Sequence, residues 1–309
     1  MKRRHFIQNV LAAGTSVSLA CNSLALRSTA REPIARTGPP RFQLGLAAYS
    51  FRSYFSFTRK GAQTPATGGA AMDMGAFLNY CAVHGFDAAE LTSYFFEPNP
   101  TADYFLELKR KAFERGVAIS GTAIGNDFTV GKGPKLERQI EDAMTWIDNA
   151  AILGAPHIRF FAGTRKQIDE QPERMVDAIE ALEKCAKHAA SKGIYLGVEN
   201  HGQLTAEQCL TIMKEVNNPW IGMNLDTGNF NSDDPYADIQ RCVPYAVNIQ
   251  VKTMMKSPTG KKSPADLERI GKILRDGGYQ GFVVLEYEEE APYDHVPKIA
   301  DQLRSALQA

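Results

Sequence analysis

The stretch Ile194-Tyr-Leu-Gly-Val-Glu199 is a short apolar run that ends in a carboxylate. Three later apolar runs also end in an acidic or amide side chain, at Asp226, Gln250 and Glu286. In a parallel αβ barrel the carboxyl ends of all strands open onto one face, and that face carries the chemistry. Oxygen ligands that converge there suit a hard divalent cation such as Mg²⁺ or Mn²⁺. We therefore expect one site, built from the ends of several strands.

Apolar, β-branched runs alternate with helix-like segments along the chain after the joint Gly38-Pro39-Pro40. The predicted strands cover residues 43–50, 86–91, 117–121, 157–161, 194–199, 220–225, 246–251 and 281–286. The predicted helices cover residues 72–84, 102–115, 134–153, 172–192, 205–216, 236–242, 264–276 and 293–307. Glycine follows several of these helices, as is typical of a helix C-terminus.

This order of elements predicts an α/β protein that forms a single-domain (β/α)₈ TIM barrel. The strands are short and apolar throughout, as strands covered on both faces should be. A doubly wound sheet would usually carry a glycine-rich phosphate loop after an early strand, and the sequence has none. The long first connection, residues 51–71, is predicted to be a mobile lid.

The N-terminal residues differ in character from the rest of the chain. Met1-Lys-Arg-Arg-His-Phe-Ile7 precedes an apolar stretch, residues 10–20, that is rich in Ala, Gly and Ser and too short to span a bilayer. Paired arginines before such a run are typical of a twin-arginine export signal, and a basic tail is the alternative. We expect residues 1–36 to be signal and linker and residues 37–309 to be the barrel.

The fate of this signal has two interpretations. Cys21 follows Ser18-Leu-Ala, a loose lipoprotein box, and lipidation there would anchor the protein. Cleavage after a small residue near Ala20, Ala25 or Ala30 would instead release it. The predicted location is therefore periplasmic or lipid-anchored, with no transmembrane span.

Composition excludes several other classes of protein. Lys and Arg together number 35, and so do Asp and Glu. The sequence has no cluster of basic residues of the kind that binds nucleic acid, so a nucleic-acid-binding protein is not expected. The five cysteines are scattered and contain no C-x-x-C pair, so we expect free thiols rather than a disulfide framework.

An ordered series of segments resembles the xylose isomerase-like TIM barrel superfamily, the sugar phosphate isomerase/epimerase group. The segments are Leu44-Gly-Leu-Ala-Ala-Tyr-Ser, Gly85-Phe-Asp-Ala-Ala-Glu-Leu, Gly197-Val-Glu-Asn-His, Asn224-Leu-Asp-Thr-Gly-Asn, Val247-Asn-Ile-Gln-Val-Lys and Val284-Leu-Glu-Tyr-Glu. The resemblance implies an enzyme that moves a proton beside the carbonyl of a small-molecule carbohydrate. It also implies one divalent metal ion, Mn²⁺ or Mg²⁺, with Zn²⁺ as an alternative.

The same resemblance assigns residues to the metal and to proton transfer. Family members bind the metal with a Glu, an Asp, a His and a Glu after the fifth to eighth strands. The matching residues are Glu199, Asp226, Gln250 and Glu286, with Gln250 in place of the histidine. Glu199 and Glu286 are the expected acid/base pair.

Four further residues are expected to bind substrate. Epimerases of this group often carry a histidine at the position of Asn229, and His201 is a candidate replacement for that imidazole. Lys252 shares a strand face with Gln250 and is expected to contact a substrate oxyanion, with an ion pair to Glu286 as the alternative.

Glu90 ends the second predicted strand, where this family often contacts a sugar hydroxyl. An ion pair with Arg159 or Arg52 is the alternative interpretation of that carboxylate.

The predicted function is an exported, metal-dependent sugar isomerase or epimerase that acts through an enediolate. Two alternatives stay open at this point. The same chemistry supports a lyase or dehydratase on a keto-sugar or glycoside. The departures at Gln250 and Asn229 also leave room for a non-catalytic carbohydrate-binding barrel.

Overall fold

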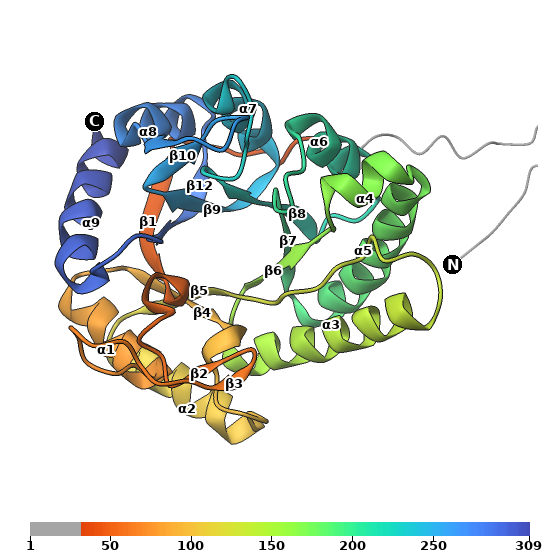
Figure 1. Cartoon of the computed structure of the whole chain (residues 1–309). Coiled ribbons are helices and arrows are strands. Elements are labelled where there is room, and N and C mark those ends of the chain that lie inside the picture. Colours follow the sequence, from red (N-terminus) through yellow and green to blue (C-terminus); the bar gives the residue numbers. More distant parts are fainter. Residues whose placement is uncertain (1–31) are drawn as a thin grey trace, which may run out of the picture.

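The structure, a computed structural model, describes residues 32–309, and its eight parallel strands close into a barrel ringed by helices (Figure 1). Around the barrel the strand order is β1-β12-β9-β8-β7-β6-β5-β4. The barrel strands are β1 (Arg41–Ala47), β4 (Ala88–Thr92), β5 (Ala118–Ala123), β6 (His157–Phe161), β7 (Tyr195–Glu199), β8 (Ile221–Asp226), β9 (Ala246–Lys252) and β12 (Gln280–Glu286). The predicted TIM barrel is confirmed. The predicted signal and Cys21 lie outside the described residues.

Helices follow the strands and bury one face each against the barrel. They are α1 (Met74–Val83), α2 (Ala102–Glu114), α3 (Pro134–Leu153), α4 (Arg165–Glu170), α5 (Glu173–Lys192), α6 (Ala206–Glu215), α7 (Pro235–Cys242), α8 (Leu267–Asp276) and α9 (Pro292–Gln308). Residues that favour helix ends are found where they are needed: α3 begins at Pro134, and Gly154 follows its last residue with a φ of 79°, which few residues other than glycine adopt. Within residues 32–309, no helix is long and apolar enough to cross a membrane.

The connections hold the elements that the sequence did not predict. The first strand ends at Ala47, earlier than predicted, and a 3₁₀ turn, η1 (Ala48–Phe51), follows it. The predicted lid carries a small hairpin of β2 (Phe57–Thr58) and β3 (Gly61–Ala62). A second hairpin, β10 (Met254–Lys256) with β11 (Lys262–Pro264), follows β9, and so α8 begins three residues later than expected. Two further 3₁₀ turns are η2 (Ser93–Phe95) and η3 (Val243–Tyr245). Strands of two or three residues are too short to show a periodic pattern.

Strand register brings the predicted site residues side by side. Glu286 on β12 lies opposite Lys252 on β9, and Gln250 on β9 lies opposite Asp226 on β8. Because all these strands run in parallel, the four side chains meet at the carboxyl end of the barrel.

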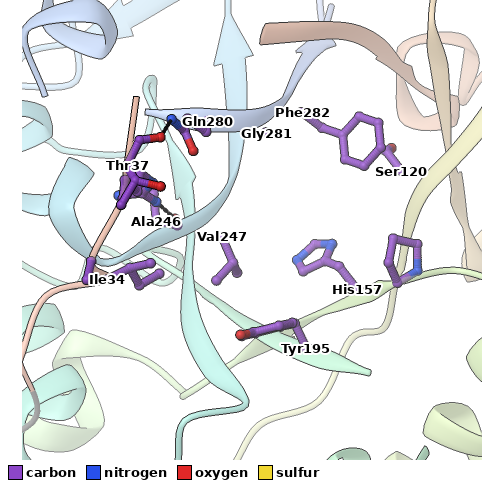
Figure 2. A pocket seen from close by; sticks show the side chains of 13 residues that line it. Ile34, Thr37, Ser120, His157, Tyr195, Ala246, Val247, Gln280, Gly281 and Phe282 are labelled. Carbon is purple, nitrogen blue, oxygen red and sulfur yellow. Dashed lines mark hydrogen bonds between the residues drawn. The ribbon is translucent and has the colours of Figure 1, made fainter. Parts of the chain in front are cut away.

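His157 fills the other end of the barrel, at the start of β6. It lines a pocket of about 390 Å³ together with the N-terminal segment 34–37. Figure 2 shows the residues that line this pocket. Two glycines make room for the imidazole, because a Cβ at Gly121 or Gly197 would overlap its ring nitrogens. The ring is buried, and in the described part of the chain neither nitrogen has a hydrogen-bond partner. His157 therefore belongs to the packing of the barrel and lies away from the site described below.

We expect Gly197→Ala to lower the free energy of unfolding by about 1–3 kcal/mol, because the new methyl group overpacks against His157. Urea unfolding of the single variant and of the same change made in His157→Ala measures this. In the His157→Ala background the clash is relieved, so Gly197→Ala should lower the free energy of unfolding there by roughly half as much or less. Equal costs in both backgrounds would show that His157 is not the reason for the glycine.

Candidate functional site

A cavity of about 210 Å³ opens at the carboxyl ends of the barrel strands. It is lined by Tyr49, Arg59, Tyr94, Arg159, Phe161, Glu199, His201, Lys252, Glu286 and Glu288. Asp226 and Gln250 are fully buried at neighbouring strand ends. The structure thus brings the residues predicted for metal binding and for proton transfer into one place.

Lys252 lies at the centre of the acidic residues. Its Nζ is 3.1 Å from Glu288 Oε1, 3.2 Å from Asp226 Oδ2, 3.2 Å from Asn229 Oδ1 and 3.3 Å from Glu286 Oε1. Burial alone would lower the pKa of this ammonium, but the surrounding carboxylates raise it well above its ordinary value. Lys252 therefore stays charged, and its positive charge is shared among three acids.

A chain of side-chain amides fixes the orientation of Gln250. Asn248 donates to Asn224 at 2.7 Å, Asn224 donates to Gln250 Oε1 at 2.6 Å, and Gln250 Nε2 donates to Glu286 Oε2 at 2.6 Å. An ionised carboxylate can only accept, so Glu286 sets the direction of every bond in the chain. The amide oxygen of Gln250 consequently faces Asn224 and is turned away from the carboxylates.

Glu199 has its own cation. Its Oε2 lies 2.8 Å from Arg159 Nε, and its Oε1 accepts a hydrogen bond from Asn229 Nδ2 at 2.9 Å. Burial raises the pKa of Glu199 to about 7, although the positive charge of Arg159 opposes the rise. Burial also raises the pKa of Glu286 to about 7, opposed by Lys252. Both carboxyls therefore titrate near neutral pH.

Glu90 and His201 complete the predicted set in different ways. Glu90 is buried, and its Oε1 accepts from Thr92. Its Oε2 has no hydrogen-bond partner among residues 32–309. Burial raises the pKa of Glu90 to about 7, so this carboxyl is partly protonated near neutral pH. His201 lines the cavity and stacks on Phe161, with ring centroids 4.0 Å apart. Loss of solvent, then the charges of Arg159 and Lys252, lowers its pKa to about 4. Its imidazole is therefore neutral.

The sequence did not assign Arg159, Glu288, Tyr94 or Arg59 to the site. Arg159 could have been predicted, because a charged residue in the middle of the apolar strand β6 needs a buried acidic partner. Tyr94 and Arg59 come from the η2 turn and from the tip of the β2–β3 hairpin, and their guanidinium-over-ring contact is 4.8 Å long. Contacts between loops of this kind leave no periodic mark in a sequence.

The predicted metal ligands as arranged here do not fit a divalent ion. Glu199 lies against Arg159 and Asn229, Asp226 against Lys252 and the Gly228 amide, and Glu286 against Lys252 and Gln250. Within residues 32–309, Asp226 Oδ2 accepts no hydrogen bond and meets Lys252 only as an ion pair. The side-chain oxygen of the fourth predicted ligand, Gln250, accepts a hydrogen bond from Asn224 and does not point toward the carboxylates. Across residues 32–309, no group of three or more His, Cys, Asp or Glu side chains is placed to hold a metal ion. The chemistry derived below therefore uses no metal.

Comparison with known proteins decides the family. Residues 78–308 match the family model described as Xylose isomerase-like TIM barrel. The chain belongs to this family. No curated protein matches the sequence significantly.

Several solved structures share the fold of this xylose isomerase-like barrel. D-psicose 3-epimerase with D-tagatose from Clostridium cellulolyticum H10 is 16% identical, with a TM-score of 0.66 over 86% of this chain and 99% of that one. The E. coli 3-keto-D-glucoside 4-epimerase is 15% identical, with a TM-score of 0.64 over 86% and 100%. A xylose isomerase-like protein from Mycobacterium smegmatis in complex with magnesium is 20% identical, with a TM-score of 0.58 over 88% and 98%. At these identities the likeness shows the fold alone.

Removal of Arg159 tests how the buried acids are neutralised. In Arg159→Met, Glu199 keeps its burial and loses its cation, so we expect the free energy of unfolding to fall by about 3 kcal/mol at pH 8. At pH 5 the loss should be smaller, because a carboxyl with a folded pKa near 7 and a lower unfolded pKa is protonated there. Urea unfolding at the two pH values measures both.

The double variant Arg159→Met with Glu199→Gln is the control, because it removes the buried charge together with its partner. It should recover most of the loss at pH 8. An equal loss for Arg159→Met at pH 5 and pH 8 would contradict the charge-based account.

Proposed function

We propose that this protein is an isomerase or epimerase of a sugar, acting by proton transfer next to a carbonyl group. The observation that carries the proposal is the pairing of Glu199 and Glu286 in one cavity, each with a pKa of about 7. Near neutral pH such a pair can supply one ionised carboxylate, the base, and one protonated carboxyl, the acid. Epimerisation and isomerisation need both forms at once.

The walls of the cavity favour a sugar over other carbonyl compounds. Tyr49, Tyr94 and Phe161 line it and offer apolar ring faces on which a sugar ring can stack. The volume of about 210 Å³ is below the roughly 300–1,000 Å³ of sites for drug-sized ligands, which favours a single sugar unit. The epimerase names of two solved structures with this fold agree with the proposal.

Proton transfer leaves negative charge on the carbonyl oxygen, and the cavity must stabilise it. Lys252 and Arg159 line the same cavity and carry positive charge. Donors that are already in place and partly shielded from water stabilise an oxyanion far better than solvent does. The metal dependence predicted from the sequence would instead require Glu199, Asp226 and Glu286 to turn oxygens from Arg159, Lys252 and their amide donors toward the ion.

Exchange of a substrate hydrogen with solvent deuterium tests the function. Purified protein would be incubated with a panel of free keto-sugars, 3-keto-glycosides and aldoses in D₂O and followed by NMR. We expect deuterium to enter beside the carbonyl, together with an epimer or isomer. Glu199→Gln and Glu286→Gln should each slow exchange by about 100-fold or more, because each removes one proton carrier.

Glu289→Gln is the matched control, since Glu289 lies in the same loop and bonds Thr253 outside the cavity. It should keep the wild-type exchange rate. Release of a leaving group would place the protein among the lyases and dehydratases. Sugar binding without exchange would reject an enzyme and favour the carbohydrate-binding barrel.

We also propose that the protein leaves the cytoplasm by the twin-arginine route, on the strength of Arg3-Arg4 and the apolar run after them. A reporter fused to residues 1–36 should be exported, and the pair Arg3→Lys with Arg4→Lys should retain it in the cytoplasm. Cys21→Ser should abolish fatty-acid labelling of a lipid-anchored form. Export of the double-lysine variant at the normal rate would contradict this route.

A further inference from the structure

We propose that the Lys252 ammonium stands in the place of a divalent metal ion and is the cation that binds the substrate oxyanion. The proposal rests on the function proposed above for the chemistry, but its structural half can be tested without substrate. Lys252 Nζ has four oxygens at 3.1 to 3.3 Å, three of them from carboxylates of β8, β12 and the loop after β12. Acidic oxygens from several strand ends converge on this nitrogen in the way that they would converge on a metal.

Neighbouring residues fix the position of the Lys252 backbone and of the aliphatic part of its side chain. Its backbone N–H donates to Thr227 Oγ1 at 3.2 Å, and its side chain passes over Gly228. A Cβ at Gly228 would lie 2.7 Å from Lys252 Cβ and 2.9 Å from Lys252 Cδ. A side chain at position 228 would therefore overlap the stem of Lys252, and its Cβ would also lie 2.8 Å from the Met254 carbonyl oxygen.

Asn229 forms a hydrogen bond to Glu199 and another to Lys252, and so connects the Arg159–Glu199 ion pair with the acidic cluster around Lys252. Its Nδ2 donates to Glu199 Oε1 at 2.9 Å, and its Oδ1 accepts from Lys252 Nζ at 3.2 Å. A carboxylate can only accept and an ammonium can only donate, so this amide has one orientation. A side chain that offers a donor and an acceptor on one group fits between Glu199 and Lys252.

Lys252 also has a donor to offer a substrate. An ammonium has three N–H groups, and here four oxygens surround it. Asn229 Oδ1 is the neutral one among the four, so it is the weakest competitor when a negatively charged oxygen arrives. Since Lys252 lines the cavity, a substrate carbonyl oxygen can take that N–H.

The reaction then balances without a metal. A carboxylate, Glu199 or Glu286, takes the proton from the carbon beside the carbonyl. The C–H electron pair forms the C=C bond, and the carbonyl π electrons move to oxygen, where the Lys252 ammonium stabilises the charge. The other carboxyl returns a proton to carbon, and the C=O bond forms again. No oxidant, reductant or second substrate is consumed.

Metal titration of substrate-free protein tests the structural half. After dialysis against EDTA and then buffer, wild type and Lys252→Ala would be titrated with MnCl₂ by calorimetry. Removing the ammonium leaves the acidic cluster open, so we expect Lys252→Ala to bind one Mn²⁺ about 100-fold or more tightly than wild type. Lys256→Ala loses the same charge from the neighbouring strand β10 and should behave as wild type.

Weak binding of Mn²⁺ by wild type and tight binding by Lys252→Ala would support the proposal. Stoichiometric micromolar binding by wild type, or no tighter binding by the folded Lys252→Ala, would overturn it. If Lys252→Ala does not fold without metal, the variant Lys252→Met with Glu288→Gln carries one acid fewer and takes its place.

Solvent exchange separates this proposal from the proposed function. Wild-type exchange should be unaffected by EDTA, and Lys252→Ala should be slower by about 100-fold or more. Exchange that requires added Mn²⁺ in the wild type would overturn the role of Lys252 and keep the isomerase. If no sugar exchanges at all, the titration still decides whether Lys252 takes the place of the metal.

Discussion

The contact between the Lys252 ammonium and three carboxylates is the interaction on which the site depends. Asp226 and Glu286 are buried at strand ends where neither could stay ionised without a cation at hand. Arg159 does the same for Glu199 on the other side of the cavity. Two positive side chains thus allow a cluster of acids to be buried, and they leave those acids with pKa values close to neutrality.

The barrel supplies the geometry for this contact. Parallel register places Glu286 opposite Lys252 and Asp226 opposite Gln250, so ordinary strand pairing sets the distances between charged groups. The amide chain from Asn248 to Gln250 runs across the same strands and ends on Glu286. A shift of one residue in any of these strands would turn its side chain out of the site.

The sequence predicted most of the fold because eight apolar runs with helices between them allow few arrangements. It also placed Glu199, Asp226 and Glu286 at one end of the barrel, since strand ends are visible as the last residue of an apolar run. It could not predict that Gln250 turns its oxygen toward Asn224, because that orientation follows from a chain of bonds across three strands. Nor could it predict the hairpin that brings Arg59 near Tyr94, because strands of two residues show no alternation.

A crystal structure of the wild-type protein grown with Mn²⁺, with data collected at the manganese absorption edge, tests the central claim most directly. We predict density for Lys252 Nζ among Asp226, Glu286 and Glu288, with no anomalous peak within the cluster. An anomalous peak bound by Asp226 and Glu286, with the Lys252 side chain displaced into the cavity, would contradict the account. It would show that the lysine and the metal compete for one place and that the metal wins.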